Sequence, residues 1–274
     1  MKFGIDIATL GDEFGHPRKV AQLAQAAEAA GWEGLFVWDH LAFAWGVPSG
    51  DPWVILTAAA SVTEKILLGT AVTPIPRRRP QVLANTLATL DIFSKGRMIF
   101  GAGLGGVPGE FSAFGESENA KDRAVLLDEG LEVITRLWSG EPVNFHGACF
   151  TVKNVTLAPL PIQRPRIPIW IGGESPPALR RAARWDGWIV GADDETAKMV
   201  KSPIQLGDLV TTVLGYCIEK TAYDIAITGV STPHDGALAR EYADAGVTWW
   251  LESIHGMRGS FDEMLIRVKA GPPQ

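Results

Sequence analysis

Strand-like apolar segments and amphipathic helical segments alternate along almost the whole chain of 274 residues. The segment 34–38 holds a continuous apolar run, which is typical of a parallel strand covered on both faces. The segment 17–30 has apolar residues at spacings of three and four, as one face of a helix requires. The expected strands are residues 3–8, 34–38, 66–72, 98–101, 167–171, 188–190, 225–230 and 247–251. Eight strands with about eight helices predict a closed (β/α)8 barrel, the TIM-barrel fold.

The length and the lack of a linker favour one domain over residues 1–274. Pro, Gly and Ser residues never accumulate into a linker-like stretch. One segment, residues 142–152, breaks the alternation, because it looks like two short strands around a turn at His146 and Gly147. We expect it to form a β-hairpin insertion between the fourth helix and the fifth strand.

The charge and the cysteines exclude several classes of protein. The formal net charge is -6, and the only local basic cluster is Arg77, Arg78 and Arg79, which is expected to be a solvated loop, so nucleic acid is not an expected partner. Cys149 and Cys217 match no metal or redox spacing. The chain has no signal-peptide pattern and no apolar run of the ~20 residues that a membrane span needs. A cytoplasmic protein without membrane contact is therefore expected.

Polar residues follow several of the expected strands, where the active site of such a barrel lies. A histidine at a strand exit can hydrogen-bond a ligand or move a proton near neutral pH, so Asp39 and His40 are the best catalytic candidates. The alternative is that this pair only caps a loop. Other polar residues at strand exits are Thr70, Thr73, Glu252, Ser253 and His255.

The fifth strand ends on two glycines, and a helix starts almost at once. Gly172 and Gly173 let the backbone approach a ligand, Ser175 has the character of an N-cap, and Pro176 suits the first helical position. Free N–H groups at a helix start attract phosphate, although ordinary helix capping explains the same residues without a ligand.

Residues 101–106 match G-x-G-x-x-G after a strand, but they do not predict a dinucleotide-binding fold. Pro108 and Gly109 stand where the helix that holds the pyrophosphate should begin. The glycines suit a flat ring against bare backbone instead. Glu110 follows them and is expected to be a solvated loop residue, the alternative being an acid in the pocket.

Other reactive arrangements are absent from the sequence. The five histidines show no helical metal-binding pair, no G-x-S-x-G motif occurs, and no lysine falls at an expected strand exit. No metal is therefore expected, and a metallohydrolase, an α/β-hydrolase and a lysine-dependent aldolase are disfavoured.

Together, several phrases of the sequence resemble the bacterial-luciferase-like monooxygenase family, which includes FMN-dependent monooxygenases and oxidoreductases that use the deazaflavin F420. The similarity runs from about Phe3 to Pro273. The phrases are Trp38-Asp39-His40-Leu41, Leu68-Gly69-Thr70-Ala71-Val72-Thr73-Pro74, Gly96-Arg97-Met98-Ile99-Phe100-Gly101-Ala102-Gly103, Glu110-Phe111-Ser112-Ala113-Phe114-Gly115 and Pro168-Ile169-Trp170-Ile171-Gly172-Gly173.

The resemblance implies a barrel with the flavin or deazaflavin ring at the carboxyl ends of the strands. It implies a cis peptide bond between Ala71 and Val72, His40 beside the reactive part of the ring, and Asp39 in contact with the cofactor. Glu174 and Ser175 match the turn that binds the cofactor phosphate in the luciferases. The expected catalytic residues are His40 and Asp39, and the expected cofactor-binding residues are Asp39, Thr70, Ala71, Val72, Thr73, Gly103, Leu104, Gly105, Gly172, Gly173, Glu174 and Ser175.

Two departures bear on the choice of cofactor and substrate. The luciferase arginine that meets phosphate falls on Leu104, which favours F420 over FMN. The acidic residue of F420-dependent sugar-phosphate dehydrogenases falls near Gly106, which argues against their substrate.

The expected function is hydride or activated-oxygen transfer between the cofactor and a small organic substrate. An FMN-dependent monooxygenase is the alternative, and a barrel that binds a phosphorylated ligand without redox chemistry, or an inactive flavin-binding protein, is the non-redox alternative. A homodimer is expected, and a separate flavin or F420 reductase is a further possible partner.

Overall fold

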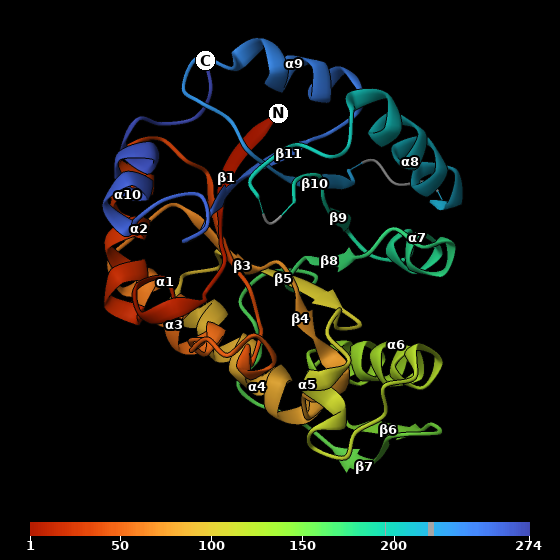
Figure 1. Ribbon diagram of the computed structural model, residues 1–274. Helices are drawn as coiled ribbons and strands as arrows, with labels where there is room; N and C mark the ends of the chain where they lie inside the picture. The colour runs from red at the N-terminus through yellow and green to blue at the C-terminus, as the bar shows by residue number, and fades with distance from the viewer. Residues whose placement is uncertain (195, 219–221) are drawn as a thin grey trace.

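The structure, a computed structural model, describes residues 1–194, 196–218 and 222–274. Its main sheet has nine strands, and β4 (Thr73–Pro74) is a two-residue strand that pairs with β5 beyond the end of β3. The other strands are β1 (Lys2–Ile7), β2 (Gly34–Val37), β3 (Leu67–Thr70), β5 (Met98–Gly103), β8 (Ile169–Gly172), β9 (Gly187–Gly191), β10 (Asp224–Gly229) and β11 (Trp249–Ile254). They pair in parallel, and a further pairing between β3 and β5 closes the ring. The predicted (β/α)8 barrel is confirmed (Figure 1).

Each barrel strand is followed by a helix that covers the outside of the barrel (Figure 1). These helices are α2 (Pro17–Ala29), α3 (Pro52–Ser61), α4 (Pro80–Phe93), α6 (Ala120–Leu137), α7 (Pro176–Ala182), α8 (Pro203–Tyr216), α9 (Gly236–Asp244) and α10 (Phe261–Lys269). The apolar face expected in α2 is buried, and Asp51 caps α3 by accepting the N–H of Trp53 at 3.0 Å. Within the described ranges, no helix has both the length and the apolar character needed to cross a membrane.

Shorter elements occupy the connections. They are α1 (Gly11–Phe14), η1 (Phe43–Trp45), η2 (Ile75–Arg77) and α5 (Gly109–Ser112). Between α6 and β8, the strands β6 (Val143–His146) and β7 (Thr151–Val155) form a separate antiparallel pair. Glu129 on α6 fixes the turn between them, because its carboxylate accepts the N–H groups of Ala148 at 2.6 Å, Cys149 at 2.9 Å and Phe150 at 3.1 Å.

The barrel interior is filled by a second apolar cluster, distinct from the core between strands and helices. The cluster consists of Phe36, Ile99, Trp170, Ile189, Ala226, Trp249 and Leu251. Phe36 stacks on Trp170 with 5.1 Å between ring centroids, and Trp249 packs edge-on against Trp170 at 5.5 Å. Because side chains alternate along a strand, the residue two positions after each member of this cluster also faces the interior. This aromatic plug therefore forms the floor beneath the carboxyl ends of the strands.

Asp6 lies beside the plug, on β1. It pairs in register with Phe36 on one side and with Ser253 on the other, and it is 2% exposed. The indole N–H of Trp38 donates to Oδ2 of Asp6 at 2.8 Å, whereas Oδ1 has no hydrogen-bond partner in the described residues. Burial raises the pKa of Asp6 to about 8, the bond from Trp38 partly offsets this, and the nearby Asp193 raises the pKa further.

The raised pKa of Asp6 predicts that the free energy of unfolding decreases as the pH rises. Because the pKa of Asp6 is higher in the folded chain than its ordinary value of 3.8, its contribution to stability is complete below pH 4 and is lost as the pH rises to about 8. Over this window, Asp6 alone should lower the free energy of unfolding by up to about 1.4 kcal/mol per pH unit. The Asp6→Asn variant keeps the acceptor for Trp38 and should remove this slope.

Urea unfolding at pH 5, 6, 7 and 8 measures the effect. Asp244→Asn, which removes an exposed helical carboxylate, is the matched control and should keep the wild-type slope. Equal slopes for Asp6→Asn and the wild-type protein would contradict a buried, protonated Asp6.

Candidate active site

The closed parallel barrel brings the carboxyl ends of all its strands to one end, which we call the barrel mouth. Asp39 and His40 follow β2, Thr70 ends β3, and Gly172 ends β8. The residues predicted from the sequence as a site therefore share one end of the fold. No group of three or more His, Cys, Asp or Glu residues suited to a metal ion occurs in the part of the chain described by the structure.

The segment after β3 forms a raised platform at the mouth. The expected strand 66–72 is too long, because β3 ends at Thr70 and the Ala71–Val72 peptide bond is cis, as the resemblance implies. The hydroxyl of Thr70 donates to the carbonyl of Gly101 at 2.8 Å. Ala71 and Val72 are only half-buried, so this platform remains open to a ligand.

The glycines at the neighbouring strand ends make room for Val72. A Cβ atom added at Gly103 would lie 2.4 Å from a methyl carbon of Val72, and one added at Gly172 would lie 3.1 Å from it. The bare backbone expected from the sequence thus packs against the platform. Beside it, the hydroxyl of Thr73 is fully buried and has no hydrogen-bond partner among the described residues.

The basic cluster after β4 is not the solvated loop that was expected. The side chain of Arg77 is only 7% exposed, because η2 turns it inward toward Asp39. Its Nη2 lies 2.9 Å from Oδ1 of Asp39 and 2.7 Å from the Asp39 carbonyl oxygen. Arg78 donates to the same Oδ1 at 2.7 Å, and Oδ2 of Asp39 is left without a partner in the described structure.

Glu110 on α5 is also buried, whereas a solvated glutamate was expected. Its Oε1 accepts the N–H groups of Leu41 and Ala42, each at 2.9 Å, and its Oε2 forms an ion pair with Nη1 of Arg77. Burial raises the pKa of this carboxyl, but the Ala42 N–H together with His40 and Arg77 lowers it below the ordinary value. Glu110 is therefore ionised at neutral pH.

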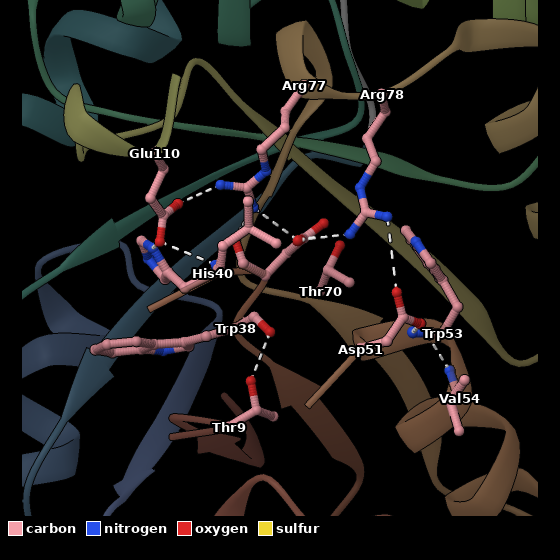
Figure 2. Close-up of polar contacts among 12 residues, drawn as sticks. Thr9, Trp38, His40, Asp51, Trp53, Val54, Thr70, Arg77, Arg78 and Glu110 are labelled. Atoms are coloured by element: carbon pink, nitrogen blue, oxygen red, sulfur yellow. Dashed lines mark hydrogen bonds and ion pairs between the residues drawn. The ribbon is translucent and has the colours of Figure 1, made fainter. Parts of the chain in front are cut away.

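His40 contacts this buried network and still reaches the surface of the mouth. Its Nδ1 lies 3.2 Å from Oε1 of Glu110, and its side chain is 22% exposed. The ring lies between Trp38 and Trp45, with centroid distances of 5.8 and 4.9 Å. Figure 2 shows how Glu110, Arg77 and Arg78 converge on the segment that carries His40. An accessible imidazole on a rigid support can exchange a proton with a bound molecule.

The expected phosphate turn is exposed and differs from a simple helix-start site. Gly173 has a φ of +109°, and the hydroxyl of the N-cap Ser175 makes no capping bond. Pro176 and Pro177 occupy the first two helical positions and have no N–H, so the helix offers fewer donors than expected. Lys201 supplies a charge that the sequence did not reveal, because its Nζ lies 3.2 Å from the carboxylate of Glu174.

The segment after β5 is held by packing and by one hydrogen bond from an arginine. Leu104 packs against the main apolar core. Gly105 has a φ of +88°, and its carbonyl oxygen accepts a bond from Nη1 of Arg123 at 2.9 Å. Its Cβ, if present, would lie 2.6 Å from the ring of Phe111, so this tight turn requires glycine.

Of the polar residues expected after the last strand, Glu252 lies within β11 and does not reach the mouth. Its neighbours Trp250 and Ile254 belong to the outer core, so Glu252 faces the helices. Its carboxylate pairs there with Arg258 at 2.5 Å and Arg267 at 3.3 Å. The expectation that Glu252 lines the pocket is wrong, because alternation directs it outward.

Comparisons with known proteins agree on one family. The family model described as luciferase-like monooxygenase matches residues 1–203. An F420-dependent glucose-6-phosphate dehydrogenase from Microbacterium testaceum is 34% identical over 204 residues, which cover 71% of this chain and 58% of the relative. An F420-dependent hydroxymycolic acid dehydrogenase from Mycobacterium tuberculosis is 35% identical over 196 residues, with 70% and 53% covered. The chain thus spans a little over half the length of these curated relatives.

Solved structures share the fold over nearly the whole chain. A monooxygenase from Streptomyces bottropensis has a TM-score of 0.79 at 22% identity, and 98% of this chain and 97% of that chain are covered. The coenzyme F420-dependent tetrahydromethanopterin reductase from Methanopyrus kandleri has a TM-score of 0.77 at 21% identity with the same coverage. At such identities the likeness concerns the fold, whereas the family model covers most of the sequence. The chain belongs to the luciferase-like monooxygenase family.

Proposed function

We propose that this protein is an oxidoreductase that binds F420 at the barrel mouth and transfers a hydride between it and a small organic substrate. The observation that carries the proposal is that the half-open platform of Ala71 and Val72 and the accessible imidazole of His40 follow two neighbouring strands at the same end of the barrel. The curated relatives described above are named F420-dependent, which supports the choice of cofactor.

The residues at the mouth fit a planar ring with polar edges. Ala71 and Val72 offer an apolar face, and two buried oxygen atoms next to it lack a partner among the described residues. These are Oδ2 of Asp39 and Oγ1 of Thr73. A buried polar atom without a partner costs about 1–3 kcal/mol, so a ligand that bonds to both would recover this energy.

Each part of the site then has a role. The deazaflavin, when bound, supplies the hydride chemistry. His40 exchanges a proton near the reactive centre, and Asp39 and Thr73 hold the polar edge of the ring. The segment from Gly172 to Ser175, together with Lys201, holds the phosphate.

An FMN-dependent monooxygenase is the alternative within the same family, and it would need a separate reductase as partner. Leu104 disfavours it, because an apolar side chain packed on the core stands where the luciferases carry a phosphate-binding arginine. A homodimer and a cytoplasmic location are part of the proposal, and sedimentation at low protein concentration tests the dimer.

One prediction from this proposal concerns cofactor choice. Purified apoprotein should bind F420 at least ~10-fold more tightly than FMN, which corresponds to about 1.4 kcal/mol. Fluorescence titration with each cofactor, oxidised and reduced, measures both affinities. Tighter binding of FMN would favour oxygen chemistry, and failure to bind either cofactor would remove the redox function.

A second prediction concerns Lys201. Lys201→Ala should weaken F420 binding by roughly 10-fold, because a charge-assisted contact to phosphate contributes about 1.5–3 kcal/mol. It should leave binding of the F420 chromophore without its phosphate unchanged. Lys198→Ala, which removes an exposed lysine from the same segment, is the matched control. Equal losses for both ligands would show that Lys201 acts on the fold and not on the phosphate.

A further inference from the structure

One carboxylate at the barrel mouth receives donors from four groups. Glu110 accepts the N–H groups of Leu41 and Ala42, contacts Nδ1 of His40 and forms an ion pair with Arg77 (Figure 2). Every one of the first three contacts ends on the same oxygen, Oε1. The segment 40–42 is thus held by one atom of a residue about 70 positions away.

The charge of Glu110 determines which nitrogen of His40 carries a proton. The lowered pKa of Glu110 keeps it ionised, so its oxygens only accept hydrogen bonds. Nδ1 of His40 must therefore carry the hydrogen that it shares with Oε1. In a neutral imidazole the other nitrogen, Nε2, then has a free lone pair, and it makes no hydrogen bond to any described residue.

Arg77 prevents Glu110 from moving away. Its guanidinium contacts both Glu110 and Asp39, and its side chain is almost fully buried. A planar guanidinium that bridges two carboxylates fixes both in direction. The loops after β2 and β5 are therefore locked together through η2.

We propose that Glu110 is a positioning residue that fixes His40 as the Nδ1–H tautomer and leaves Nε2 as the nitrogen that exchanges a proton with the substrate. Arg77 holds Glu110 in this role. The inference rests on the proposed function for the identity of the reaction, but the tautomer is a property of the protein alone.

The alternative is that Glu110 only clamps a turn. Glu129 provides the matched comparison, because its carboxylate likewise accepts backbone N–H groups, three where Glu110 accepts two, but lies at the hairpin connection. Replacement of either residue by methionine keeps the length of the side chain and removes the acceptor. Only the Glu110 variant should change His40.

The test is nitrogen-15 NMR of the histidine side chains in the full-length apoprotein at pH 8–9. The chain has five histidines, and a His40→Asn variant assigns the signal of His40. The wild-type protein and Glu129→Met should both show a protonated Nδ1 and a bare Nε2. In Glu110→Met, the hydrogen should move to Nε2 in most molecules, because Nδ1 has lost its acceptor.

A wild-type His40 with its hydrogen on Nε2 would overturn the proposal even if no variant folds. An unchanged tautomer in Glu110→Met would do the same. With F420 bound and a substrate identified, kcat of Glu110→Met should fall by at least ~100-fold while KM changes little, as expected for a lost acid–base contribution. Since the NMR needs no cofactor, failure of F420 binding would end the proposed function and leave the role of Glu110 standing.

Discussion

The ion pairs of one buried guanidinium, that of Arg77, organise the candidate site. Arg77 touches the carboxylates of Asp39 and Glu110, which come from two different loops of the barrel. Burying either carboxylate alone would cost several kcal/mol; Glu110 depends on Arg77, and Asp39 on Arg77 together with Arg78. The segment between β2 and α3 takes its course from this arrangement, because Glu110 fixes the backbone of Leu41 and Ala42.

The fold could be predicted from periodicity because a barrel repeats one simple pattern. Apolar strand runs and helix faces such as Val20, Leu23, Ala24 and Ala27 depend only on neighbours in sequence. Strand ends were less certain. The strand was predicted to reach Val72, but β3 stops at Thr70 and the peptide bond between Ala71 and Val72 is cis. At this point Val72 packs against Gly103 and Gly172. Those glycines lie 31 and 100 positions further along the chain.

The site was only partly predictable for a related reason. Asp39 and His40 follow a strand directly, so their position at the mouth comes from the fold itself. Arg77 and Glu110 are buried because they pair with each other. The sequence around each of them is that of an ordinary surface residue. A G-x-G run followed by a glutamate gave no sign that its carboxylate would meet an arginine 33 positions earlier.

Glu110 and Asp6 differ in their protonation state, and the difference depends on whether a cation lies beside the carboxyl group. Glu110 has Arg77 beside it and stays ionised. Asp6 lies beside the aromatic plug, next to Asp193 and without an ion-pair partner in the described residues, so it keeps its proton up to about pH 8. The mouth therefore carries an ionised carboxylate in contact with His40, and β1, the strand beside β2, carries a neutral acid bonded to Trp38.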